Sequence, residues 1–184
     1  ADLLRLGADI ASIEPFTDIF HVDVADGHFS PALLLFPDQV AAIRRATAKP
    51  IHVHLMVADA ILDGQIRQFA EAGADLISIH AENAGIDRAL ELIASLGCLA
   101  GIVLQLRTPV GKAAPFLDRL AMLTLLGTEI GIKGVGLDAS AGARLAEAKA
   151  MIARANAPQR LLLAADGGIR GELGIDRARL RHHQ

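Results

Sequence analysis

Histidine and aspartate residues alternate with apolar residues in two short segments of the sequence. One segment reads IFHVDV and contains His21 and Asp23, and the other reads IHVHLM and contains His52 and His54. Residues two apart on a β-strand point to the same face, so each segment would present its polar pair on one side. Burying so many polar groups without a ligand is costly. Converging imidazole and carboxylate groups suit one divalent ion, Zn²⁺, Fe²⁺, Mn²⁺ or Co²⁺.

A third carboxylate follows a later apolar run. Asp166 comes directly after the segment LLLAA and is followed by Gly167 and Gly168. Two glycines allow the backbone to approach an anion closely and to donate N–H groups to it, although the same residues could form a plain turn. If the segments of Asp23 and Asp166 are strands of one ring, the two carboxylates could flank a bound substrate from opposite sides.

Other residues near the ends of the apolar segments could orient a metal ligand, form a turn or bind substrate. His80 and Glu82 either orient the ligands or lie at the rim without a role. For Asp26 we predict a turn in which the carboxylate binds local backbone N–H groups. Met56 either packs in the core or lines the edge of a metal pocket, and Gln105 could bind a substrate hydroxyl.

A glycine-rich stretch, GTEIGIKGVG over residues 127–136, follows another apolar run. Backbone amides in such a loop, which includes Gly134, can hold a phosphate, and Lys133 would add positive charge. The alternative is a flexible loop, because the stretch lacks the spacing of a Walker motif.

These residues lie in a chain that alternates short β-type runs with longer segments of helical period. We predict strands near residues 19–24, 51–56, 76–80, 99–104, 121–126 and 160–165. A βα repeat predicts a parallel sheet. Polar groups at the carboxyl ends of several strands favour a (β/α)₈ TIM barrel, whose active sites lie there. The alternative, an open Rossmann-like sheet, would need a G-x-G-x-x-G turn after its first strand, and none occurs there.

The predicted strands number two fewer than a TIM barrel needs. We therefore expect residues 1–184 to form a single α/β barrel domain that is incomplete at both ends, lacking the first and last strands. The basic tail, residues 176–184, shows no β pattern. The strands at 19–24 and 160–165 would then be unpaired edges, which we expect to loosen the metal site and weaken phosphate binding.

Composition excludes several classes of protein. Apolar residues make up 52% of the chain and charged residues 21%, with a net charge of −3. This balance argues against a nucleic-acid binder, and no apolar run is long enough for a membrane span. Cys98 is the single cysteine, which excludes a disulfide framework. We expect a cytoplasmic protein.

Several motifs together resemble the ribulose-phosphate 3-epimerase family. Residues 21–31, HVDVADGHFSP, resemble its H-x-D-x-M-D-G-x-F-x-P signature, and HVHLM over residues 52–56 resembles its D-x-H-L-M strand. The similarity extends from residue 1 to about 170, through AD at 1–2, AGAD at 72–75, TP at 108–109 and DGGI at 166–169.

The resemblance implies a TIM barrel that holds one divalent metal ion and assembles as a homo-oligomer. It implies an isomerase of carbohydrate metabolism that inverts C3 of a phosphorylated ketose, D-ribulose 5-phosphate or a close relative, through an enediolate. The implied metal ligands are His21, Asp23, His54 and Asp166. Asp23 and Asp166 would also be the acid/base pair, and the expected substrate-binding residues are Met56, Gln105, Gly134, Gly167 and Gly168.

The sequence departs from the family pattern at three places. Ala25 stands where the family has Met, His52 stands where it has Asp, and the loop 127–134 replaces N-P-G-F-G-G-Q. These changes leave open a pentulose, tetrulose or hexulose phosphate as substrate. Two other functions remain open: an epimerase-like barrel fragment without activity, and a metal-dependent hydrolase suggested by the His-x-His pair.

Overall fold

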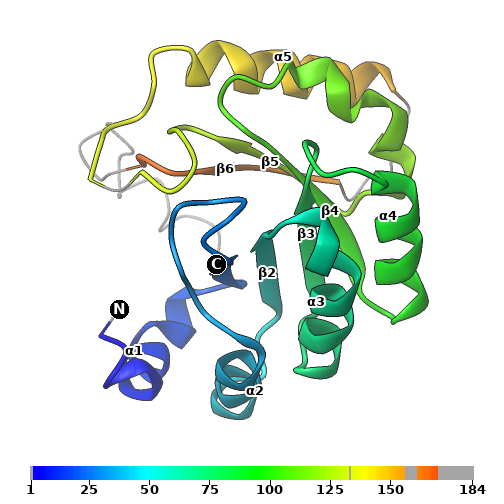
Figure 1. Cartoon of the computed structure of the whole chain (residues 1–184). Helices are drawn as coiled ribbons and strands as arrows, with labels where there is room; N and C mark the ends of the chain where they lie inside the picture. The colour runs from blue at the N-terminus through cyan, green and yellow to red at the C-terminus, as the bar shows by residue number, and fades with distance from the viewer. Residues whose placement is uncertain (1, 133, 156–160, 170–184) are drawn as a thin grey trace.

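The strands form one six-stranded parallel sheet in the order β1-β2-β3-β4-β5-β6. The computed structural model describes residues 2–132, 134–155 and 161–169 (Figure 1). The strands are β1 Phe20–Ala25, β2 Ile51–Met56, β3 Leu76–His80, β4 Leu99–Leu104, β5 Met122–Leu126 and β6 Leu162–Asp166. All six predicted strands are confirmed, with small shifts at their ends.

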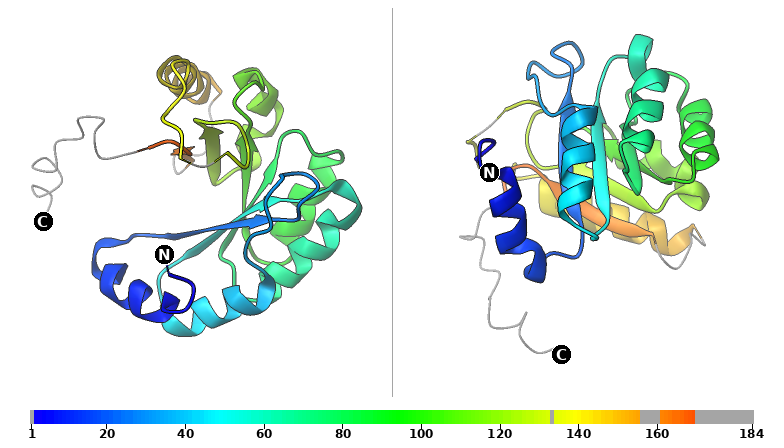
Figure 2. Two further views of the ribbon diagram at one scale, coloured as in Figure 1. Left: turned by 60° about the vertical axis from the view of Figure 1, so that its left-hand side comes forward. Right: turned by 90° about the horizontal axis from the view of Figure 1, so that it is seen from below.

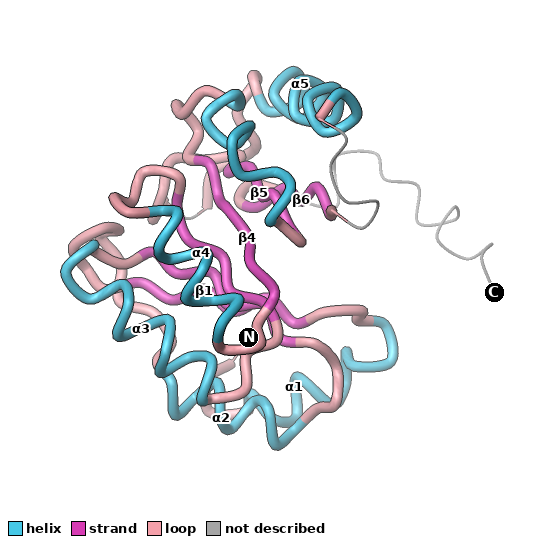
Figure 3. The backbone as a smooth tube through the Cα atoms, turned by 90° about the vertical axis from the view of Figure 1, so that its right-hand side faces the viewer, coloured by secondary structure: helices cyan, strands magenta, loops and turns pink. Residues whose placement is uncertain are grey.

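Helices cover the outer face of the curled sheet, as Figure 2 and the tube in Figure 3 show. They are α1 Leu6–Ile13, η1 Glu14–Phe16, α2 Pro37–Ala46, α3 Asp59–Glu71, α4 Ile86–Ser95, η2 Val110–Arg119 and α5 Ala141–Arg154. Gly73 follows α3 with a φ of 99°, a left-handed conformation that favours glycine and ends the helix. None of the described helices is long and apolar enough to cross a bilayer.

Alternation along the strands separates an apolar face from a polar one. The residues that face the helices are buried aliphatic side chains, among them Val22, Val24, Ile51, Val53, Ile77, Ile79, Ile102 and Leu123. The alternate positions on β1 to β3 carry His21, Asp23, His52, His54, Ser78 and His80. The outer face therefore supplies the hydrophobic core, and the inner face is free to carry chemistry.

The sheet has two edges in the described part of the chain. There β1 pairs with β2 and β6 pairs with β5, and no pairing joins β1 to β6. The prediction of a barrel-like fold that lacks two strands is thus confirmed. The six described strands form a curled sheet that stays open between β1 and β6. The curl nevertheless brings the end of β6 toward β1, since Oδ2 of Asp166 lies 3.7 Å from Nε2 of His21. The basic tail, residues 176–184, lies outside the described residues.

Candidate metal centre and active site

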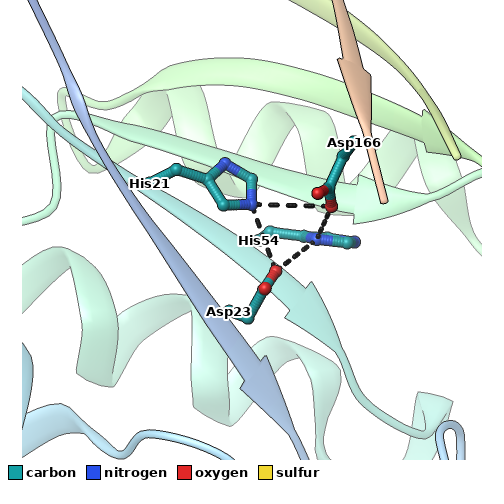
Figure 4. Close-up of side chains that lie close together, drawn as sticks. All are labelled: His21, Asp23, His54 and Asp166. Carbon is teal, nitrogen blue, oxygen red and sulfur yellow. Dashed lines mark hydrogen bonds and ion pairs between the residues drawn. The ribbon is translucent and has the colours of Figure 1, made fainter. Parts of the chain in front are cut away.

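Four side chains from three strands meet on the inner face of the sheet (Figure 4). Nε2 of His21 lies 3.1 Å from Oδ1 of Asp23, and Nδ1 of His54 lies 2.9 Å from the same oxygen. Oδ2 of Asp166 lies 3.6 Å from Nδ1 of His54. One ligand atom from each of the four residues lies within 4.8 Å of the other three, so the group could hold a metal ion. These four residues, His21, Asp23, His54 and Asp166, are called the cluster below.

Strand register explains why these residues meet. His21 lies opposite His52 and Asp23 lies opposite His54 in the parallel pairing of β1 with β2. Asp166 ends β6 opposite Leu126 of β5, at the same end of the sheet. The structure therefore brings together all four residues that the sequence predicts as ligands.

The electrostatics of the cluster favour a negative Asp23. Burial alone would raise the pKa of this carboxyl, but its hydrogen bonds with His21 and His54 outweigh burial and hold the pKa well below its usual range. Burial would likewise lower the pKa of His21, but the hydrogen bond to Asp23 and the charges of Asp23 and Asp166 raise it. The first shift stabilises the negative carboxylate and the second stabilises a positive charge beside it, and a divalent cation would supply such a charge.

Each imidazole of the cluster contacts a second imidazole outside the cluster: His52 contacts His21, and His80 contacts His54. Nδ1 of His52 is 2.9 Å from Nδ1 of His21, and its Nε2 is 2.8 Å from the Ser78 hydroxyl. Burial, together with the proximity of His21 and His54, lowers the pKa of His52 to about 3 despite the charge of Asp23. His52 is therefore neutral at physiological pH. The sequence predicts that His52 shares a face with His54 but contains no signal for its contact with Ser78.

His80 and Glu82 are connected to the cluster through His54. Nε2 of His80 lies 2.9 Å from Nε2 of His54, and Nδ1 of His80 lies 3.0 Å from Oε2 of Glu82. Glu82 also accepts hydrogen bonds from the Thr108 hydroxyl and the Gln105 backbone N–H. Burial would raise the pKa of Glu82, but these hydrogen bonds lower it, while burial lowers the pKa of His80. This arrangement favours the interpretation in which His80 and Glu82 orient a ligand.

A pocket opens from the cluster toward the loops that follow β5 and β6. It is lined by the cluster residues Asp23, His54 and Asp166, by the predicted substrate-binding residues Met56, Gly134, Gly167 and Gly168, and by Ser30, Thr128 and Glu129 among others. Gln105 is not among the lining residues, and its backbone carbonyl accepts a hydrogen bond from Arg144. Lys133 lies outside the described residues. Ser30 lies in the 21–31 motif and Thr128 in the 127–136 loop, but the sequence singled out neither residue for the pocket.

Glycines after β6 allow the pocket wall to form. Gly167 has a φ of 81°, and a Cβ atom there would lie 2.6 Å from Oγ1 of Thr128. A Cβ atom on Gly168 would lie 2.8 Å from the backbone nitrogen of Leu137. Both positions therefore need glycine for the loops after β5 and β6 to pack together.

The turn predicted at Asp26 is confirmed. Oδ1 accepts hydrogen bonds from the backbone N–H groups of His28 and Phe29, both at 2.8 Å, and Oδ2 accepts one from Ala58 at 2.7 Å. Burial would raise the pKa of Asp26, but these three N–H groups lower it. The carboxylate thus ties the loop after β1 to the loop after β2.

Comparisons with known proteins agree with the resemblance in the motifs. The sequence model of the ribulose-phosphate 3 epimerase family matches residues 1–176. The ribulose-phosphate 3-epimerase of Bacillus subtilis is 37% identical over 174 residues, which cover 94% of this chain and 79% of that protein. Ribulose-phosphate 3-epimerase 1 of Cupriavidus necator is 38% identical over 176 residues, covering 94% and 72%. The Escherichia coli K12 enzyme of that name is 34% identical over 173 residues, covering 92% and 75%.

A solved structure shows the same fold. A mutant tryptophan synthase α-subunit from Pyrococcus furiosus superposes with a TM-score of 0.63 at 12% identity, covering 91% of this chain and 74% of that one. Identity this low supports the fold alone. With a matching family model along nearly its whole length and relatives above 30% identity, the chain belongs to the ribulose-phosphate 3-epimerase family.

Proposed function

We propose that the chain is a metal-dependent epimerase that inverts C3 of a phosphorylated ketose, D-ribulose 5-phosphate or a close relative. The observation that carries this proposal is the convergence of two imidazoles and two carboxylates within 4.8 Å, in a member of this family. The pocket beside the cluster supplies the space for a substrate. We also propose a cytoplasmic location, which the single cysteine supports, and assembly with copies of itself, which the family resemblance supports.

The donor set fits a divalent transition metal ion. His21, Asp23, His54 and Asp166 would hold it through two nitrogens and two oxygens, a mixture that suits Zn²⁺, Fe²⁺, Mn²⁺ or Co²⁺ better than Mg²⁺ or Ca²⁺. When bound, such an ion stabilises the negative charge that develops on the substrate oxygens as a proton leaves C3.

Inversion at carbon requires a proton-transfer group on each face of the substrate. Asp23 comes from β1 and Asp166 from β6, and the two carboxylates approach from different sides with the imidazoles between them (Figure 4). In the proposed reaction, one carboxylate removes the C3 proton, the C3–H electron pair forms an enediolate, and the other carboxyl returns a proton to the opposite face. Asp23 and Asp166 are partly exposed, at 42% and 31% of their side chains, so a substrate can reach both.

The phosphate of the substrate would lie against the loops after β5 and β6. Gly134, Gly167 and Gly168 line the pocket there, and all three have positive φ angles, between 73° and 82°. Successive N–H groups in such conformations can form a concave binding site for an anion. We propose that the loops after β5 and β6 bind the phosphate through backbone amides.

Exchange in D₂O tests this function directly. The chain, reconstituted with Zn²⁺, Mn²⁺ or Co²⁺, is incubated with D-ribulose 5-phosphate, and mass spectrometry and NMR measure deuterium at C3. We expect one deuteron at C3 and formation of D-xylulose 5-phosphate. A metal-dependent hydrolase would instead release a cleavage product without exchange. A chain that binds metal and exchanges no proton would be the inactive barrel.

A further inference from the structure

We propose that His52 and His80 are positioning residues, each of which holds one imidazole of the cluster in the tautomer that leaves its inward nitrogen free to bind a cation. This inference rests on the proposed metal-dependent function. It assigns a role to two buried side chains that lie outside the ligand set.

Hydrogen-bond geometry carries the first step. The His21–His52 and His54–His80 contacts each join two ring nitrogens 2.9 Å apart. At this distance one nitrogen must donate and the other must accept, because two N–H groups or two lone pairs would repel. His52, His54 and His80 are all buried, so the protein partner decides which nitrogen carries the proton.

Glu82 sets which nitrogens donate in the chain of hydrogen bonds from His54 through His80 to Glu82. An ionised carboxylate only accepts, so Nδ1 of His80 must donate to Oε2 of Glu82 across their 3.0 Å contact. Nε2 of His80 is then an acceptor, and Nε2 of His54 must donate to it. The nitrogen of His54 that remains for a cation is Nδ1, the atom that faces Asp23 and Asp166.

A second chain of hydrogen bonds runs from His21 through His52 to the Ser78 hydroxyl. In this chain His21 contacts its partner through Nδ1, whereas His54 contacts His80 through Nε2. The nitrogen of His21 that faces the carboxylates is Nε2, so a bound cation requires Nδ1 to donate to Nδ1 of His52. Nε2 of His52 then donates to the Ser78 hydroxyl at 2.8 Å. A hydroxyl can donate or accept, so Ser78 does not force this direction as Glu82 forces the other. The neutral imidazole of His52 thus accepts the hydrogen bond from His21 at the position where the family motif has an aspartate.

Two pairs of variants separate this role from simple packing. An asparagine carbonyl oxygen occupies the place of Nδ1 in histidine, and a glutamine carbonyl oxygen the place of Nε2. His52→Asn and His80→Gln therefore keep the acceptor that faces the ligand, whereas His52→Gln and His80→Asn lose it. Thr124→Val is the matched control, because Thr124 is a buried residue on β5 whose hydroxyl has no hydrogen-bond partner in the described structure.

Zn²⁺ affinity, measured by competition with a chromophoric chelator, is the first readout. We expect His52→Gln and His80→Asn to bind Zn²⁺ about 10–100-fold more weakly than the wild-type chain, the range for lost outer partners of metal ligands. His52→Asn, His80→Gln and Thr124→Val should stay within a few-fold of wild type. Equal losses in the two members of each pair would overturn the inference.

The second readout uses the wild-type protein and so does not depend on a variant that folds. Two-dimensional ¹⁵N NMR of the zinc-loaded chain should show His52 protonated at Nε2 and His80 protonated at Nδ1. The reverse tautomers would overturn the inference while leaving the metal site intact. A wild-type chain that binds no Zn²⁺ would instead overturn the proposed metal-dependent function, and this inference with it.

Discussion

Nδ1 of His54 lies 2.9 Å from Oδ1 of Asp23, directly across the pairing of β1 with β2. A lone pair on each atom would repel at that distance, so a proton or a metal ion has to lie between them. A cation held by both residues would take the place of that proton. At this contact Asp23, a proposed acid/base residue, touches His54, a proposed metal ligand.

Replacing either carboxylate should stop exchange at one face of the substrate. Asp23→Asn and Asp166→Asn keep the size of the side chain and remove its basicity, and each should lower C3 exchange by at least about 100-fold, while the fold is retained. Deuterium incorporation measured by mass spectrometry gives the rate, and circular dichroism checks the fold. Asp118→Asn is the control, because the exposed Asp118 lies in η2 at the opposite end of the sheet. Near-wild-type exchange in either cluster variant would remove that residue from the acid/base pair.

Metal removal should lower stability as well as activity. A cation that binds only the folded state stabilises it by about 2.7 kcal/mol when its free concentration is 100-fold above its Kd. We therefore expect Zn²⁺ to raise the melting temperature of the chelator-treated protein in differential scanning calorimetry. His54→Ala should lose this rise, and His28→Ala, which replaces an exposed histidine outside the cluster, should keep it. A rise of equal size in His54→Ala would place the ion elsewhere.

Gly101 on β4 provides the space for the Ser78 side chain. A Cβ atom at this glycine would lie 2.1 Å from Oγ of Ser78 and 3.2 Å from the Met122 carbonyl oxygen. Gly101→Ala should therefore destabilise the fold by about 1–3 kcal/mol in urea denaturation. Gly111→Ala, where no atom lies within 4 Å of the new Cβ, should change stability little. Adding Ser78→Ala to Gly101→Ala should recover part of the loss, and a purely additive double variant would contradict this account.

The three hydrogen bonds to Asp26 predict a pH dependence of stability. The pKa of this carboxyl is lower in the folded chain than its ordinary value of 3.8. The charged form is therefore the one that stabilises the fold, so its contribution is present above that value and disappears as the pH falls through the folded pKa. Asp26→Ala should cost roughly 1–2 kcal/mol at pH 7 in urea denaturation, and less at pH 3. Asp18→Ala, at an exposed position before β1, is the control and should change stability little at either pH. A difference that grows toward low pH would reverse the assigned sign.

The sequence by itself determined the strands, the parallel sheet and the polar residues of its inner face, and the family resemblance singled out the four residues of the cluster. The reason is the period of two along a strand: with valine and isoleucine facing the helices, His21, Asp23, His52 and His54 had to share the inner face. Asp166 followed from its place after an apolar run, because the carboxyl ends of parallel strands lie at one edge. The turn at Asp26 was also predictable, since its hydrogen bonds to His28 and Phe29 are local.

Only the tertiary structure decided which side chains lie behind the cluster and which line the pocket. The contacts of His52 with Ser78 and of His54 with His80 run between β2 and β3, and they depend on the stagger of those strands, for which the local sequence has no periodic signal. The same is true of Thr128 against Gly167, which meet where the loops after β5 and β6 pack. The close approach of Asp166 to His21, from opposite edges of the sheet, required the curl of the whole sheet, because twist accumulates over all six strands.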